Sequence, residues 1–246
     1  MNFRRMMIFT LAVLALCLTV APSGYADQIV VPNANANSEG DASFSGGPFR
    51  LQQVYASSQF AVAGGPLIIT QIAFRPDGDV GSAFTTTNSS LQLNLSTTSA
   101  APDALSATFA SNVGADDTVV RSGPATYGSA FTGPPGGPKD FDIVFVFTTP
   151  FTYDPTLGNL LLDIRSVDVF APTEFEGQDT FGDSVSIMFG FINSPTGGVD
   201  DTFGFVTQFT FSPAAPTPVP EPATMLLLGT GLAGVAGAAR RRRKSK

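Results

Sequence analysis

Residues 141–147 read Phe-Asp-Ile-Val-Phe-Val-Phe, so that every second side chain is large and apolar. Successive side chains of a strand point to opposite faces, and Phe141, Ile143, Phe145 and Phe147 are therefore predicted to share one face. A strand with one apolar face has to bury that face against another layer. The same period of two recurs in residues 91–96, 159–165, 184–191 and 203–211. The repeated pattern predicts antiparallel sheets that pack face to face.

Each of these segments has a predicted inner face. The inner positions are Leu91, Leu93 and Leu95; Leu160, Leu162 and Ile164; Val185, Ile187, Phe189 and Phe191; and Phe203, Phe205, Phe209 and Phe211. In the second of these segments, the alternation places Asp163 and Arg165 on the opposite face. The outer domain is thus expected to hold a core rich in phenylalanine.

Further strands are predicted at residues 50–56, 67–75, 105–109 and 118–121, between clusters of turn-forming residues. Residues 27–48 are rich in Asn, Ala, Ser and Gly and are predicted to form a flexible lead-in or a loosely held first strand. A helical period of 3.6 is not found between residues 27 and 212. The prediction is an antiparallel β-sandwich, jelly-roll-like or Ig-like, of roughly eight to ten strands.

The amino end has the pattern of a secretory signal peptide. Arg4 and Arg5 precede an apolar stretch at residues 6–20, and residues 24–26 read Gly-Tyr-Ala. Small residues after an apolar stretch are typical of a signal peptidase site. We therefore predict a signal peptide at residues 1–26, an outer domain at residues 27–212 and a Pro/Ala-rich spacer at residues 213–219.

The carboxyl end, residues 220–246, combines three features. Val219, Pro220, Glu221 and Pro222 are followed by 17 residues without charge, 223–239. As a helix, these 17 residues would extend roughly 25 Å, at the short end of what crosses a bilayer. The cations that follow resist translocation and would stay in the cytoplasm. They are Arg240, Arg241, Arg242, Arg243 and Lys244, with Lys246 at the end of the chain.

This order of motif, apolar helix and basic end resembles the PEP-CTERM sorting signal of Gram-negative surface proteins. The resemblance covers residues 219–246 and implies recognition by a membrane-embedded exosortase that cleaves near the motif. It also implies an outer domain that is first held in the periplasm by the inner membrane and is then passed to the cell surface or extracellular matrix. Many proteins with this tail accompany exopolysaccharide production. An ordinary C-terminal membrane anchor is the alternative interpretation.

Composition excludes several kinds of function for the outer domain. Residues 27–219 carry five cations and 19 carboxylates, a net charge of −14 that repels nucleic acid. The chain has no His, and its single Cys17 lies in the predicted signal peptide. His-dependent nucleophilic triads and His-ligated metal sites are therefore excluded, and the mature domain has to fold without disulfides.

Asp77 and Asp79 are the first candidates for a calcium site, because they flank Gly78 in a loop predicted to follow a strand. Calcium takes six to eight oxygen ligands, which loops at one end of a sandwich can supply together. Asp is also a favoured turn residue, which is the simpler interpretation. Other acidic pairs in predicted loops are Asp116 with Asp117, Asp179 with Asp183, and Asp200 with Asp201.

We predict that the protein is not an enzyme and needs no cofactor other than, in one hypothesis, calcium. Glycoside hydrolysis needs two carboxylates across a cleft. Glu174 and Glu176 are a candidate pair, but their position after Pro172 favours an acidic loop.

The leading hypothesis is an exported surface or matrix protein associated with exopolysaccharide or biofilm. The alternative is a calcium-assisted carbohydrate-binding or adhesive module, which would have exposed rings on a concave face near the acidic loops. A structural role would leave phenylalanine buried throughout. Ice binding by the row Thr85, Thr86 and Thr87 is less favoured, because that row does not repeat.

Overall fold

The structure is a computed structural model that describes residues 26–214 and Arg240. Thirteen strands and three short helices lie in this part of the chain. The strands are β1 (Asp27–Val31), β2 (Ala42–Gly46), β3 (Phe49–Tyr55), β4 (Leu67–Phe74), β5 (Phe84–Thr98), β6 (Thr118–Ser129), β7 (Ile143–Tyr153), β8 (Asn159–Ser166), β9 (Ala171–Asp179), β10 (Val185–Gly190), β11 (Gly198–Asp200), β12 (Phe203–Phe205) and β13 (Thr207–Pro213). The helices are η1 (Asn33–Asn35), η2 (Ser57–Ala63) and α2 (Phe109–Asn112).

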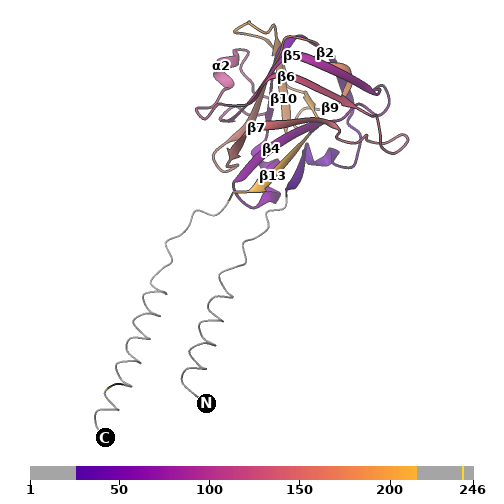
Figure 1. Cartoon of the computed structure of the whole chain (residues 1–246). Helices are drawn as coiled ribbons and strands as arrows, with labels where there is room; N and C mark the ends of the chain where they lie inside the picture. The colour runs from indigo at the N-terminus through magenta and orange to yellow at the C-terminus, as the bar shows by residue number, and fades with distance from the viewer. Residues whose placement is uncertain (1–25, 215–239, 241–246) are drawn as a thin grey trace, which may run out of the picture. The chain divides into compact units, whose positions relative to one another are not determined.

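The strands form three sheets, and every ladder between them is antiparallel. The four-stranded sheet has the order β1-β13-β4-β7, the six-stranded sheet β11-β10-β3-β8-β5-β6, and the three-stranded sheet β12-β9-β2. Figure 1 shows β13, β4 and β7 side by side, with β5 beside β6. The all-β, antiparallel prediction is confirmed.

The number of strands exceeds the roughly eight to ten predicted. Residues 27–48, predicted as a lead-in or one loose strand, contain β1 and β2, which are paired with β13 and β9. β1 buries Ile29 and Val31 in the core and Phe44 of β2 packs against it, but an apolar alternation of only one or two residues is too short to indicate a strand. The sequence could not indicate these partners, which lie more than a hundred positions away.

Two predicted strands are also revised. Residues 203–211 form two strands in different sheets, because the chain turns at Val206, whose backbone N–H donates to the Glu176 carbonyl at 3.1 Å. Residues 105–109 are not a strand, and Phe109 begins helix α2. In both places the large apolar residues are buried.

The main core lies between the inner faces of the four-stranded and six-stranded sheets. Tyr55 of β3 meets Phe209 of β13 edge-on at 5.0 Å between ring centroids. The ring centroid of Tyr127 in β6 lies 4.8 Å from that of Phe145 in β7. The predicted inner residues of β5 and β8 are buried here: Leu91, Leu93, Leu95, Leu160, Leu162 and Ile164.

The three-stranded sheet closes one end of this core with further aromatic rings. Phe175 of β9 stacks on Phe74 of β4 at 6.0 Å, and Phe205 of β12 meets the same Phe74 ring at 5.6 Å. Phe170, just before β9, stacks on Phe145 at 5.6 Å. Phenylalanine therefore fills the space where the three sheets meet.

The outer face of the six-stranded sheet, where Asp163 was predicted to lie, is covered. Phe109 of α2 and Leu105 before it form a second buried cluster with Val54, Leu161 and Met188. Asp163 is only 3% exposed and accepts hydrogen bonds from Arg50 and Gln52. Arg165, the other residue predicted on this face, keeps 40% of its side chain exposed.

Side chains join the free edges of two sheets. Arg121 of β6 donates to the Val146 carbonyl of β7 at 3.1 Å, and Thr148 of β7 donates to the Val120 carbonyl of β6 at the same distance.

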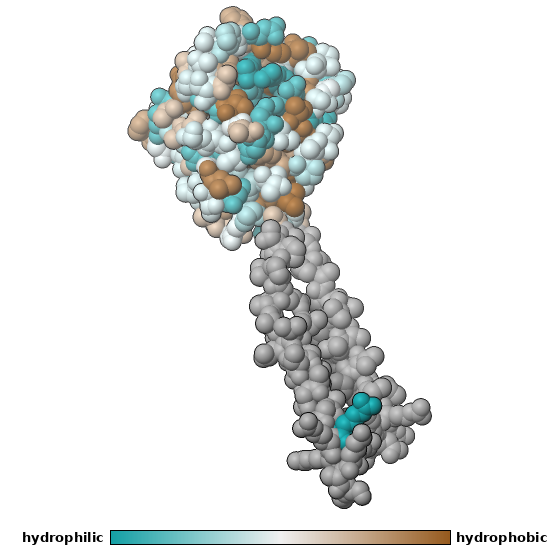
Figure 2. Space-filling model, turned by 90° about the vertical axis from the view of Figure 1, so that its left-hand side faces the viewer, coloured by the Kyte–Doolittle hydropathy of each residue, from teal (hydrophilic) through white to brown (hydrophobic). Residues whose placement is uncertain are grey.

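On the face shown in Figure 2, hydrophobic residues form separate patches among polar ones. None of the helices in the described part of the chain has the length and apolar character needed to span a bilayer.

Candidate functional site

Most residues of the predicted sorting tail lie outside the described part of the chain. This applies to Val219, Pro220, Glu221, Pro222, Arg241, Arg242, Arg243 and Lys244, while Arg240 is described and exposed. Residues 1–25 of the predicted signal peptide also lie outside the described part of the chain. The structure therefore bears on the outer domain.

Asp77 and Asp79 lie in the loop after β4, as predicted. Asp77 Oδ1 accepts hydrogen bonds from the backbone N–H groups of Asp79 and Val80, both at 2.9 Å. The Asp77 carbonyl accepts from Gly81 N–H at 2.9 Å, and its own N–H donates to the Glu174 carbonyl at 2.9 Å. The Asp77 carboxylate thus stabilises its own turn, whereas Asp79 is exposed. Within residues 26–214, no group of three or more potential ligand side chains is arranged to hold a metal ion, and calcium binding remains a prediction.

The predicted acidic loop at Glu174 and Glu176 is instead part of strand β9. Glu176 is 1% exposed and forms a two-pronged ion pair with Arg75, which is 2% exposed. The Arg75 guanidinium also donates to the carbonyls of Asn35 and Ser38, at 2.9 and 2.7 Å. This ion pair fastens the segment after β1 onto strands β4 and β9. It is a structural feature that the sequence did not predict.

A third carboxylate, Glu39, approaches this ion pair. Partial burial is the largest cause that raises the pKa of Glu39, and the nearby Glu176 charge raises it further. The Gly78 backbone and the Arg75 charge act in the opposite direction. A Cβ at Gly78 would lie 2.0 Å from a Glu39 carboxylate oxygen and 3.0 Å from the Gly137 carbonyl oxygen, so a larger residue there would displace the Glu39 side chain.

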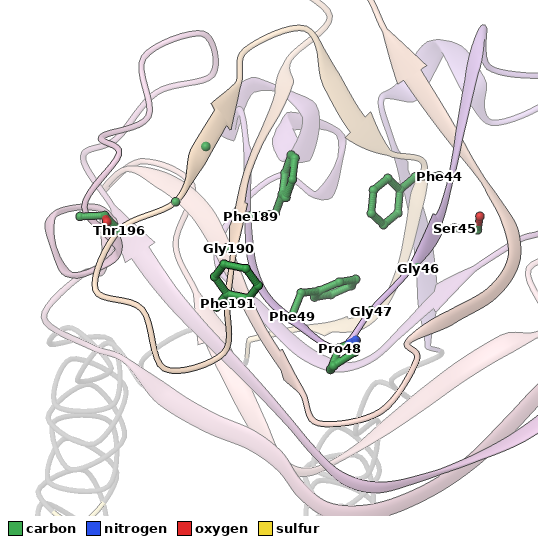
Figure 3. Close-up of a pocket in the computed structure, with 12 residues that line it drawn as sticks. Phe44, Ser45, Gly46, Gly47, Pro48, Phe49, Phe189, Gly190, Phe191 and Thr196 are labelled. Atoms are coloured by element: carbon green, nitrogen blue, oxygen red, sulfur yellow. The ribbon is translucent and has the colours of Figure 1, made fainter.

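One concave surface of the described residues is a hollow between β2 and β10, which we call the phenylalanine hollow. Its volume is about 580 Å³. Figure 3 shows the rings of Phe44, Phe49, Phe189 and Phe191 around one opening. The full lining is Phe44, Ser45, Gly46, Gly47, Pro48, Phe49, Phe189, Gly190, Phe191, Thr196, Gly197 and Gly198.

Glycines shape the floor and rim of the hollow. Gly47, in the link between β2 and β3, has φ of +123°, and a Cβ there would lie 2.8 Å from the Phe170 backbone nitrogen. At Gly197, a Cβ would lie 2.5 Å from the Phe189 carbonyl oxygen. At Gly198, by contrast, a Cβ would meet no heavy atom within 4 Å, so this position opens toward free space. The backbone can therefore run close beneath the rings and leave the hollow unfilled.

Two of the four rings are exposed, which corrects a prediction. Residues 184–191 were predicted to align Val185, Ile187, Phe189 and Phe191 on a buried face. Val185 and Ile187 are buried, but Phe189 is 41% and Phe191 85% exposed. The ladder between β10 and β11 ends at the pair of Phe189 and Gly198, and β10 itself ends at Gly190, so Phe191 lies beyond the strand.

Comparison with known proteins identifies the carboxyl end. Residues 218–243 match the family model described as the PEP-CTERM protein-sorting motif. This chain carries a PEP-CTERM sorting signal. The match contains the predicted Val219–Pro222 motif, the uncharged run and Arg240–Arg243. The resemblance inferred from the tail sequence is confirmed.

The PEP-CTERM signal accounts for about a tenth of the chain and leaves the outer domain without a matched relative. No curated protein and no solved structure matches this chain. The signal implies export and processing by an exosortase-type enzyme. The chemistry of the outer domain therefore has to be argued from its own residues.

Proposed function

We propose that this protein is a non-enzymatic surface or matrix protein, exported and sorted by an exosortase-type system and associated with exopolysaccharide. The PEP-CTERM match at residues 218–243 is the observation that carries the proposal. The acidic character of residues 27–219 supports it, because a net charge of −14 favours solubility outside the cell. The absence of His and of a mature-chain Cys supports a non-catalytic role.

The sorting step is proposed to follow from the parts of the tail. Residues 223–239 cross the inner membrane, and Arg240–Arg243 with Lys244 hold the end of the chain in the cytoplasm. Pro220 and Pro222 fix the backbone and remove two amide donors, which keeps the cleavage region out of the helix. The outer domain is then held in the periplasm until it is cleaved and transferred.

Cell fractionation with and without the exosortase-type enzyme tests the sorting proposal. We expect the wild-type chain in the surface or matrix fraction, and the uncleaved chain in the inner membrane when the enzyme is deleted. A triple variant, Pro220→Ala, Glu221→Ala and Pro222→Ala, should behave as in the deletion strain. The matched control Pro216→Ala, in the spacer, should sort normally. Equal distribution of all chains in both strains would overturn the proposal.

The partnership with polysaccharide needs a separate experiment. In a strain that makes no exopolysaccharide, we expect the processed domain in the medium instead of the matrix. Retention of the domain on such cells would overturn the proposed association with polysaccharide and leave the sorting proposal intact.

Calcium assistance through Asp77 and Asp79 predicts a higher melting temperature when calcium is added. An unchanged melting temperature would overturn the calcium hypothesis.

A further inference from the structure

The phenylalanine hollow has the size of a small-molecule site. Its volume of about 580 Å³ lies within the range of roughly 300–1,000 Å³ that is usual for ligand pockets. The rings of Phe44 and Phe189 line it in contact with each other, with 6.3 Å between their centroids and 51° between their planes. Aromatic contacts are favourable at centroid separations of about 4.5–7 Å. A flat ring placed in the hollow against the exposed side of this pair could make further contacts of this kind.

The lining carries no charge, although the domain around it is strongly acidic. None of the 19 carboxylates or five cations of residues 27–219 is among the lining residues. A charged ligand would lose hydration on entering the hollow and would gain no oppositely charged partner. The lining therefore selects for an uncharged ligand.

Many polar groups of the lining already have partners within the protein. Ser45 Oγ donates to Glu174 Oε1 at 2.6 Å, and the Gly46 carbonyl accepts from Phe170 N–H at 3.1 Å. The backbone N–H and carbonyl of Thr196 both bond the Ser194 hydroxyl. A sugar would have to leave most of its hydroxyls unpaired here, which costs free energy for each group. The lining thus favours a ligand that is apolar as well as uncharged.

The exposed rings provide the driving force. Phe189 and Phe191 keep much of their surface in water, at 41% and 85% exposure. Removing apolar surface from water stabilises a complex in proportion to the area covered. A ligand seated in the hollow would lie against the exposed side of the Phe44–Phe189 pair, with Phe191 at the rim.

We propose that the phenylalanine hollow binds an uncharged, ring-containing, largely hydrocarbon small molecule through aromatic contacts. This site is independent of the sorting signal and does not depend on the proposed function. A second copy of the chain and a neutral sugar are the competing occupants. The lining is uncharged and many of its polar groups are already hydrogen-bonded within the protein, which favours the small apolar molecule over the sugar. The concave shape favours it over a flat protein surface.

Photolabelling with benzophenone, an uncharged two-ring molecule, tests the proposal on the full chain in detergent. On irradiation, the excited carbonyl oxygen abstracts a hydrogen atom from a nearby C–H group, and the two radicals combine to form a new C–C bond. The labelled peptides are then located by mass spectrometry. We expect the label in residues 44–49 and 189–198, and we expect unlabelled naphthalene to compete with it.

Gly198→Leu is the decisive variant, because a side chain at this position meets no neighbouring atom and takes up space at the hollow. We expect it to reduce labelling of these peptides by about tenfold or more, which corresponds to about 1.4 kcal/mol of binding free energy. The matched control Phe181→Ser removes another exposed ring, 70% exposed and outside the lining, and should leave labelling unchanged. Tyrosine fluorescence in a urea series shows that both variants are folded.

Three results would overturn the proposal. The first is a label spread evenly over the surface or unaffected by Gly198→Leu in a folded protein. The second is competition by maltotriose but not by naphthalene, which would indicate a sugar site. The third is a dimer of the full chain that Gly198→Leu converts to a monomer, which would show that a second copy occupies the hollow.

Discussion

Phe170 and Phe191 are the same residue type in opposite surroundings. Phe170 is fully buried, stacked on Phe145 and edge-on to Phe74 at 5.9 Å. Phe191 is 85% exposed at the rim of the phenylalanine hollow. Three sheets meet over Phe170, whereas β10 has ended before Phe191 and no strand pairs with the chain there. Apolar alternation thus shows which residues can be buried, and the coverage by other layers decides which ones are.

The same contrast explains where the polar groups of the two regions go. In the main body, buried polar groups such as Arg75 and Glu176 bond one another and hold distant segments together. In the hollow, polar groups such as the Ser45 hydroxyl and the Thr196 carbonyl bond other protein groups, and the rings form much of the surface. The buried polar contacts of the main body stabilise the fold, whereas the phenylalanine hollow leaves apolar ring surface exposed to water.

Phe170→Ala should have the largest effect and is the most direct test of the comparison. Removing a fully buried ring should lower the free energy of unfolding by about 3–5 kcal/mol, because contacts are lost and a cavity remains. Phe191→Ala, the matched control, should change it by less than about 0.5 kcal/mol. Urea denaturation followed by tyrosine fluorescence measures both, since the chain has no Trp. Equal losses for the two variants would contradict the comparison.

Glu176→Gln tests the buried ion pair. The substitution leaves the Arg75 charge buried without its carboxylate, which should cost about 3 kcal/mol. The matched control Glu174→Gln, in the same strand but only half-buried, should cost much less. The same urea series measures the difference. Comparable stability of the two variants would show that Arg75 does not need its partner.

Tyr55→Phe tests the hydroxyl groups within the aromatic core. The Tyr55 hydroxyl lies 2.9 Å from Thr207 Oγ1, which donates in turn to the Phe205 carbonyl at 3.0 Å. Burial raises the pKa of Tyr55, so the hydroxyl stays neutral. Its loss should cost about 1 kcal/mol, because the ring remains and only the hydrogen bond is removed. An unchanged urea midpoint would mean that the hydroxyl contributes nothing to stability.

Asp183, in the turn before β10, predicts a pH effect. Burial is the main cause that raises its pKa from its usual 3.8 to about 6, and the charges of Asp103 and Asp41 add to it. Between these values the folded chain holds the extra proton, so its stability should fall as pH rises from about 4 to about 6. Because the group is half-exposed, we expect a change on the order of 1 kcal/mol.

The variant Asp183→Asn checks the source of that pH effect. It cannot ionise, so the fall in melting temperature between about pH 4 and pH 6 should become shallower than in the wild type. Asp154→Asn is the control, because hydrogen bonds from Thr156 lower the pKa of Asp154. That substitution should not flatten the profile in the same window. A wild-type slope that persists in Asp183→Asn would assign the effect to another group.

Sequence patterns predicted the inner faces best, as in Leu91, Leu93 and Leu95, because alternation is a local property of the strand. Asp163 was predicted on the face opposite the leucines of its strand, and it is buried there because the segment that carries α2 folds over it from elsewhere in the chain. Glu176 was placed in a loop because it follows Pro172, and its partner Arg75 is about a hundred residues away. Such long-range contacts leave no mark in a local pattern.

The hollow was not predicted, because Gly46, Gly47, Gly197 and Gly198 have the sequence of ordinary turns. The run of apolar residues that continues past Gly190 into Phe191 was a usable signal, since an alternation that outlasts its strand leaves rings uncovered. The sorting motif, in contrast, was predicted from residues 219–246, and the family model matches residues 218–243. The motif is defined by the order and composition of consecutive residues, which can be recognised in the sequence without knowledge of the fold.

Strand β13 lies between β1 and β4 in the four-stranded sheet, and Asp27 at the start of β1 pairs with Phe211 near the end of β13. The first strand to be synthesised, β1, therefore cannot pair in its sheet until the last strand, β13, has been made. During export, β1 and β4 have no common neighbour until residue 213 has passed through the membrane, and pairings this distant form slowly. Closure of the domain thus coincides with the arrival of its tail at the membrane, and an exported chain that stalls earlier would present two unsatisfied strand edges to quality-control proteases.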